Sequence, residues 1–276
     1  MLRKLIRTTQ RQRIWLILIL MSPALVYALS PAQGDLGRAK QMIQQLENER
    51  LEAAKAGATS KFTATYIDER LAAIGASVNQ GLLSELNAPS RPSCEALEGE
   101  LRAALGYGSV EDPHVASVTC MPSKGRVYYV VAYALTFGVA YSRSWIGIFA
   151  PSVGDGQYQT AASAADSLPS KTVALKPLPI VVGGKLSFLA YGINWSDAHN
   201  RLSVIAYSLS KGRLEPIWSR ADLPEGDIKL EGTKIKLTLL SSPLGPGYES
   251  VHEISEVYEV SGSGIRLEKR LESPRP

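Results

Sequence analysis

Apolar residues recur at three- and four-residue steps beyond residue 34, a spacing that places them on one face of a helix. This stripe predicts a helix over residues 35–56 and consists of Leu36, Ala39, Ile43 and Leu46. Asp35 is a suitable N-cap and Gly57 a suitable stop. The run is too short for about four clean heptads, so an amphipathic helix packed on its neighbours is favoured over a coiled coil.

The same spacing predicts a second helix over residues 61–86, whose stripe is Ile67, Leu71, Ile74 and Val78. Gly75 and Gly81 have low helix propensity, so one continuous helix and two shorter pieces both fit the pattern. Ser93 is placed to cap a third, short helix, with Cys94 in its first turn. The apolar face of that helix consists of Leu97, Leu101 and Leu105.

From about residue 114 the pattern changes to short runs rich in valine, isoleucine, threonine and tyrosine, separated by turn residues. These runs predict about twelve antiparallel strands, at residues 114–121, 126–137, 142–150, 157–162, 178–182, 185–191, 201–209, 213–219, 227–230, 233–240, 252–260 and 265–271. Three connections have glycine-containing pairs typical of hairpin turns, namely Gly183-Gly184, Lys211-Gly212 and Glu231-Gly232.

The strands differ in expected burial. Residues 127–137 are almost continuously apolar, which is typical of a strand covered on both faces. Residues 233–240 and 265–271 alternate instead, which predicts one buried and one solvated face. In the last strand the residues expected to point outward are Arg266, Glu268 and Arg270.

Three hairpins resemble one another in sequence and begin near residues 148, 205 and 257. They divide the strands into units of four, as in the blades of a propeller. Propellers typically have at least about four blades, so an incomplete propeller-like stack, a meander closing as a barrel and a sandwich stay open. The predicted fold class is α+β, with a helical region at 29–110 followed by an antiparallel β domain at 111–276.

Residues 1–28 have the order of a secretory signal. Five basic residues and no acidic one precede an apolar run at 14–28, which ends in the small-residue site Val26-Tyr27-Ala28. A run of about 15 residues covers only about 22 Å of a bilayer core that is about 30 Å thick. We therefore expect export to a periplasmic, cell-envelope or extracellular site. The alternative is an uncleaved membrane anchor formed by 14–28.

Charge and cysteine content fit an exported globular protein. The 276 residues carry a formal charge of +4, but without the five basic residues of 1–28 there remain 25 basic and 26 acidic groups. A near-neutral surface argues against nucleic-acid binding. Cys94 and Cys120 are the only cysteines, and an even count in an exported chain predicts a disulfide rather than two buried thiols.

Candidate catalytic and metal-binding residues are few. The three histidines, His114, His199 and His252, lack the paired spacing of a metal site, and a surface or loop position is expected for each. Asp197 could orient His199 as a base, which makes this pair the weak catalytic candidate. No metal site and no cofactor are predicted.

Aromatic residues offer a second kind of chemistry. Those in or beside strands are Trp145, Tyr191, Trp195, Tyr207, Trp218 and Tyr258, and most are expected to pack in the core. Trp195, in a polar loop, is the candidate contact residue. The sequence thus predicts an exported, non-enzymatic binding or structural protein with a protein or glycan partner. It would touch a membrane only through an uncleaved N-terminal segment. The alternative is an exported hydrolase with a dispersed active site.

Overall fold

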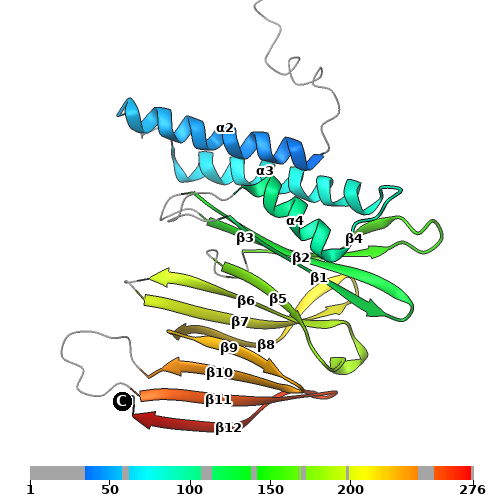
Figure 1. Ribbon diagram of the computed structural model, residues 1–276, viewed down its shortest axis with the longest axis vertical. Helices are drawn as coiled ribbons and strands as arrows, with labels where there is room; N and C mark the ends of the chain where they lie inside the picture. The colour runs from blue at the N-terminus through cyan, green and yellow to red at the C-terminus, as the bar shows by residue number, and fades with distance from the viewer. Residues whose placement is uncertain are drawn as a thin grey trace, which may run out of the picture. The chain divides into compact units, whose positions relative to one another are not determined.

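The computed structural model describes residues 35–57, 62–106, 114–137, 142–166, 168, 172–196, 199–241 and 252–274. Within these ranges, three helices are followed by twelve antiparallel strands in three four-stranded sheets (Figure 1). This is the α+β class expected from the sequence. The predicted signal at 1–28 and the predicted domain boundary at 110 lie outside the described residues.

The three helices are α2 (Asp35–Lys55), α3 (Ala64–Leu86) and α4 (Cys94–Leu105). The Oγ1 of Thr63 accepts a hydrogen bond from the N–H of Tyr66 at the start of α3, and Ser93 caps α4 in the same way, as predicted. The predicted stripes on all three helices are buried. Helix α3 is continuous, and its two glycines lie where other elements approach closely. A Cβ on Gly81 would lie only 2.6 Å from the backbone nitrogen of Leu36.

The strands form three meanders in which neighbours in sequence are neighbours in the sheet. The first sheet consists of β1 (Val115–Ser123), β2 (Arg126–Thr136), β3 (Ser142–Pro151) and β4 (Tyr158–Ala165). The second consists of β5 (Thr172–Pro177), β6 (Ser187–Ser196), β7 (His199–Ser210) and β8 (Arg213–Pro224). The third consists of β9 (Asp227–Glu231), β10 (Lys234–Leu240), β11 (His252–Ser261) and β12 (Gly264–Pro274). The repeating units of four strands are therefore confirmed.

The fifth predicted strand was misplaced. It was expected at 178–182, but β5 occupies Thr172–Pro177 and the next residues form a connection containing a 3-10 turn at Val182–Gly184. Proline at 177 and 179 removes two backbone donors from this stretch, which weakens it as a strand. Its apolar residues Leu178 and Val182 are buried in the core between the second and third sheets instead.

Of the three predicted two-residue hairpin turns, the one at Gly183-Gly184 is wrong, because these residues belong to the 3-10 turn within the longer connection between β5 and β6. Lys211 and Gly212 form the two-residue turn between β7 and β8, both with positive φ, as expected. The turn between β9 and β10 is formed by Gly232 and Thr233, one residue later than expected, because Glu231 still pairs with Lys234.

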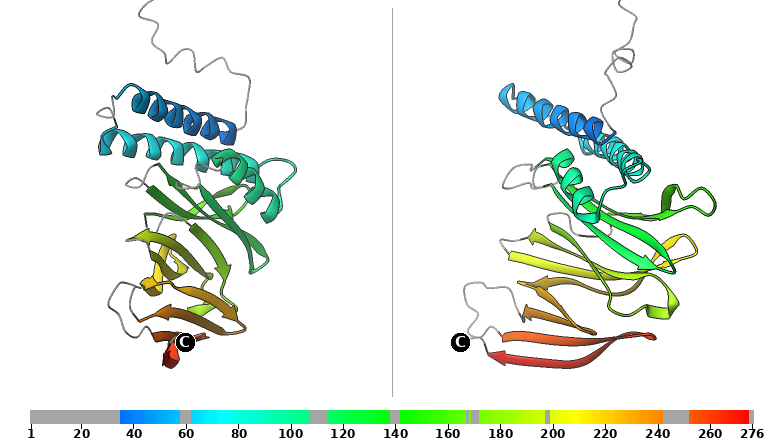
Figure 2. Two further views of the ribbon diagram at one scale, coloured as in Figure 1. Left: turned by 60° about the vertical axis from the view of Figure 1, so that its left-hand side comes forward. Right: turned by 45° about the vertical axis from the view of Figure 1, so that its right-hand side comes forward.

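The described elements pack in four layers: the helices and then the three sheets (Figure 2). One cluster of buried side chains joins the helices to the first sheet, a second joins the first sheet to the second, and a third joins the second to the third. The N–H of Leu175 in β5 also donates to the Oγ of Ser117 in β1 over 3.2 Å. The helices therefore cover the face of the first sheet that the second sheet leaves open.

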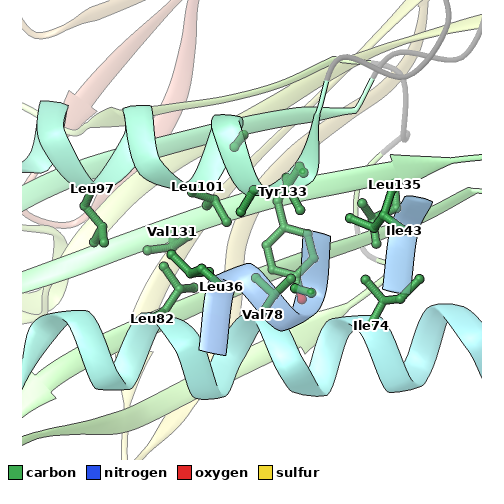
Figure 3. Close-up of a cluster of buried hydrophobic side chains, with 14 of the residues drawn as sticks. Leu36, Ile43, Ile74, Val78, Leu82, Leu97, Leu101, Val131, Tyr133 and Leu135 are labelled. Carbon is green, nitrogen blue, oxygen red and sulfur yellow. The ribbon is translucent and has the colours of Figure 1, made fainter. Parts of the chain in front are cut away.

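Strand β2 lies at the centre of the first sheet, as its continuous apolar sequence predicted. Its residues from Tyr129 onward are buried on both faces. Val131, Tyr133 and Leu135 face the helices, where they meet leucine and isoleucine side chains of α2, α3 and α4 (Figure 3). The intervening residues Val130, Ala132 and Ala134 face the second sheet. Coverage on both faces explains why the strand has no polar alternation.

The third sheet has one buried face. Ile235, Leu237 and Leu239 point inward from β10, as the alternation predicted. The prediction for the last strand is only partly right. Arg266, Glu268 and Arg270 are exposed as predicted, but Leu267 and Leu271 are also exposed, each to 52%, so the apolar side of this strand is not buried. A register shift after Val257 leaves Glu268 without a paired residue in β11.

The predicted disulfide joins Cys94, the first residue of α4, to Cys120 in β1, with Cα atoms 5.8 Å apart. It links the helical region to the first sheet. In the part of the chain that the structure describes, no helix combines the length and the hydropathy that a membrane crossing requires.

Candidate functional site

A cavity of about 430 Å³ lies between α3 and strands β2, β3 and β4 of the first sheet. We call it the α3–sheet groove. Helix α3 contributes small residues and two polar side chains, and the sheet contributes two aromatic rings and a charged rim. The size falls in the range of about 300–1,000 Å³ that is typical of small-ligand sites.

The floor of the groove is aromatic. Tyr133 of β2 and Trp145 of β3 are paired across the two strands, with ring centroids 5.4 Å apart and planes 28° from parallel. Tyr133 is buried, and its hydroxyl donates to the carbonyl of Gly75 in α3 over 3.3 Å. Burial raises the pKa of Tyr133 far above the usual tyrosine value, so this hydroxyl remains protonated at physiological pH. Trp145 is only partly buried and is the ring available to a ligand.

Gly147 holds the space in which the indole of Trp145 lies. The two residues point to the same side of β3, because they are two positions apart in a strand. A Cβ on Gly147 would lie 1.9 Å from the nearest carbon of the indole. The indole therefore lies along the strand and over the glycine, which makes it a flat floor.

The roof of the groove is the face of α3 that carries Ala72, Gly75 and Ala76. Gly75 permits the hydroxyl of Tyr133 to approach the helix backbone, since a Cβ there would lie 3.2 Å from that oxygen. One turn further along, the side-chain oxygen of Asn79 is buried and has no hydrogen-bond partner among the described residues. A buried acceptor without a donor is unfavourable, so a ligand that supplies a donor would be stabilised here.

The rim is an array of three charges. The guanidinium of Arg143 in β3 lies 3.1 Å from the carboxylate of Asp68 in α3 and also forms an ion pair with Asp166, just after β4. The two carboxylates raise the pKa of Arg143, with Asp166 contributing most. All three side chains are roughly half exposed, and their combined charge is −1. The rim therefore presents both acceptors and a donor to the solvent-facing side of the groove.

Asp166 is held in an uncommon conformation at this rim. Its φ is +51°, in the left-handed region that aspartate tolerates better than most residues. Its N–H donates to the carbonyl of Ser144 over 2.8 Å, and Ser144 in turn donates to the carbonyl of Leu168 over 2.9 Å. These contacts fix the chain beyond β4, so the position of the carboxylate is set before any ligand arrives.

For two of the three candidates predicted from the sequence, Trp195 and His199, the structure describes the backbone. Trp195 is near the end of β6 and His199 begins β7, so both belong to a hairpin of the second sheet. Asp197 and the side chains of Trp195 and His199 lie outside the described residues. The catalytic and binding roles proposed for them from the sequence therefore stay predictions.

Of the other two histidines, His114 lies just before β1, outside any helix or strand, and its side chain is buried. It is 8% exposed, and the centroid of its ring lies 4.9 Å from that of Phe137. Its Nδ1 accepts from the N–H of Thr136 over 3.3 Å, and its Nε2 lies 3.5 Å from Glu47. His252 is partly exposed, with its Nδ1 2.7 Å from Glu272. Among the described residues, no three histidine, cysteine or acidic side chains are grouped to hold a metal ion.

The residues of the groove were missed at the sequence level, apart from Trp145 as one of several aromatic residues. Asp68, Arg143 and Asp166 are far apart in the chain and form no local motif. The usable signal was the stretch from 142 to 147, where an arginine and a tryptophan precede a glycine inside a predicted strand. Glycine inside a strand often marks a close approach of another group.

Comparisons with known proteins give no assignment. The sequence matches no family model, and no curated protein matches it. Among solved structures, it is similar to an acylaminoacyl peptidase in complex with Z-Gly-Gly-Phe-chloromethyl ketone. That match has 10% sequence identity and a TM-score of 0.27, and it covers 56% of this chain. The chain spans about a third of that structure, 32% of its length, and a likeness this low supports no conclusion on fold or function.

Proposed function

We propose that this protein is an exported, non-enzymatic binding protein of the cell envelope or extracellular space that holds its ligand in the α3–sheet groove. The observation that carries the proposal is the groove itself: a cavity of about 430 Å³ with a partly exposed indole as its floor and a charged rim. Concave sites that combine an apolar surface with a few fixed polar groups are the usual form of small-ligand sites.

The groove is built on rigid elements, which favours a binding role. Trp145 and Arg143 come from β3, a strand paired on both sides, and Asp68 comes from the continuous helix α3. Asp166 is fixed by its backbone contact with Ser144. Side chains held in this way lose little conformational entropy when a ligand binds.

Export is supported by two features of the chain. The N-terminal sequence has the order of a secretory signal, and the disulfide between Cys94 and Cys120 is the kind of bond that persists in oxidising compartments. Mass spectrometry of the mature protein from its host tests the proposal. A mature N-terminus near Leu29 is expected. If the apolar run at 14–28 is retained instead, the protein is anchored in the membrane by that run and not secreted.

A fluorophore placed at the roof of the groove tests the binding role. Both native cysteines are in the disulfide, so a single introduced cysteine can be labelled selectively. The probe position is Ala76→Cys, and the control is Lys236→Cys on the solvated face of the third sheet. We expect fractions of the host envelope or medium to change the emission at position 76 only. Equal responses at both positions, or none at 76, would contradict a binding role for the groove.

A further inference from the structure

We infer that the ligand of the α3–sheet groove contains a neutral sugar ring, stacked on Trp145 and hydrogen-bonded to Asn79 and to the rim. This inference rests on the proposed binding function and names its ligand class. Three features of the groove lead to it. They are the flat indole of Trp145, the side-chain oxygen of Asn79 without a partner among the described residues, and the combined charge of −1 on the rim.

The floor and roof select a flat ligand. The indole of Trp145 lies along β3 over Gly147, and the facing part of α3 carries small residues at Ala72, Gly75 and Ala76. The resulting space suits a ring placed parallel to the indole. The C–H groups on one face of a sugar ring and the π face of an aromatic ring are complementary, because the aromatic face carries partial negative charge.

The polar groups select a ligand that both donates and accepts hydrogen bonds. The buried oxygen of Asn79 lacks a donor, and the half-exposed oxygens of Asp68 and Asp166 accept further hydrogen bonds. Arg143 supplies donors beside them. A hydroxyl both donates and accepts hydrogen bonds. Neighbouring hydroxyls on one ring can therefore donate to the carboxylates and accept from the guanidinium. An aromatic peptide side chain such as phenylalanine would stack equally well but would leave Asn79 without a donor.

The charge of the rim argues against an anionic ligand. Arg143 is the only cation of the array, and two carboxylates already neutralise it, which leaves a combined charge of −1. A phosphate or a uronate would have to displace an aspartate from Arg143 or remain close to it. Like charges at such distances repel, so a neutral ring is favoured over its phosphorylated form.

The test compares three probe sets with the full mature protein by saturation-transfer NMR and calorimetry. The probes are neutral mono- and disaccharides, including glucose, galactose and N-acetylglucosamine, then glucose 6-phosphate, and then N-acetyltryptophanamide. We expect at least one neutral saccharide to bind with a dissociation constant on the order of 1 mM or below, which is typical of so small a ligand. Glucose 6-phosphate is expected to bind more weakly than glucose.

Two variants locate the binding. Trp145→Ala removes the floor, and Asn79→Leu replaces the unpartnered amide with an apolar side chain of similar size. Each is expected to weaken saccharide binding by about tenfold or more. The matched control is Trp218→Phe in β8, which packs on Tyr258 with ring centroids 4.9 Å apart and does not line the groove. Asn79→Leu keeps the test decisive if Trp145→Ala folds poorly.

The inference is overturned if no neutral saccharide binds, or if binding is equally strong in Asn79→Leu and the wild type. Preferential binding of N-acetyltryptophanamide, lost in Trp145→Ala, would also overturn the sugar assignment but would leave the groove as a binding site. The emission of the fluorophore at position 76 tests the binding role of the groove independently of the ligand class. Failure of the ligand class and failure of the proposed function are therefore distinguishable.

Discussion

Arg220 of β8 and Glu256 of β11 form an ion pair of 2.9 Å that links the second sheet to the third. Glu256 is 2% exposed, and the hydroxyl of Tyr258 donates to its carboxylate over 2.7 Å. Arg270 of β12 lies 3.8 Å from the same carboxylate. A buried carboxylate is tolerated only when charged and hydrogen-bonding groups surround it in this way.

Removing the charge of this carboxylate is expected to destabilise the protein. Glu256→Gln leaves Arg220 without its partner, and we expect a loss of about 2 kcal/mol in the free energy of unfolding. This is below the usual cost for a buried pair, since Arg220 is partly exposed. Urea denaturation measures it. The control is Glu268→Gln, whose exposed ion pair with Lys234 is expected to contribute far less to stability. Equal losses in the two variants would contradict the role assigned to burial.

Tyr258 makes the stability of the protein sensitive to alkaline pH. Burial and the hydrogen bond to Glu256 raise the pKa of Tyr258 from 10.0 to about 12. Above pH 10 the unfolded chain loses this proton while the folded chain keeps it, so the free energy of unfolding falls as pH rises from 10 to 12. The slope from this group approaches about 1.4 kcal/mol per pH unit. Urea midpoints at several pH values measure it, and Tyr258→Phe should show a shallower decline. An unchanged slope in that variant would contradict the assignment.

Two helix glycines are expected to respond in opposite ways to alanine. Gly99 in α4 is exposed, and a Cβ at this position would have no neighbouring atom within 4 Å, so Gly99→Ala should stabilise by about 0.5–1 kcal/mol through helix propensity. At Gly81 the new Cβ would lie 2.6 Å from the backbone nitrogen of Leu36, so Gly81→Ala should destabilise by about 2 kcal/mol. Thermal and urea unfolding of both variants measure the difference. Stabilisation at both positions would show that α2 does not pack closely on α3.

The disulfide is expected to stabilise the joint between α4 and the first sheet. It closes a loop with a sequence separation of 26, for which chain entropy predicts about 3.5 kcal/mol. The double variant Cys94→Ser with Cys120→Ser should lose about that amount in urea unfolding. A reductant should lower the stability of the wild type and leave the double variant unchanged. A reductant effect in both proteins would point to a cause other than the disulfide.

Two substitutions of Asp166 separate the effect of its charge on stability from the effect of its backbone conformation. Asp166→Asn keeps a residue that tolerates a φ of +51° and removes only the half-exposed ion pair with Arg143, so a loss below about 1 kcal/mol is expected. Asp166→Ala should cost about 1 kcal/mol more, because alanine is disfavoured in the left-handed region. Urea unfolding of the pair measures the difference. Equal stability of the two variants would mean that the backbone at Asp166 relaxes freely.

Most of the secondary structure, and its division into units of four strands, could be predicted from the sequence. Local periodicity is a property of neighbouring residues, so the stripes of α2, α3 and α4 and the runs of the strands could be recognised without tertiary information. The cap at Ser93 and the turn at Lys211 and Gly212 are equally local. The fifth strand was predicted at the wrong residues, because an apolar stretch such as 178–182 fits a strand and a buried connection equally well.

Features that depend on contacts between residues distant in the sequence could not be predicted in this way. Tertiary packing placed Leu36 against Gly81, and it buried His114 beside Phe137. It also shifted β12 by one residue opposite Val257. The groove is the clearest case, since its rim joins Asp68 to Arg143 across 75 positions of sequence. Such a site has no local signature, because its geometry exists only once the helices have covered the first sheet.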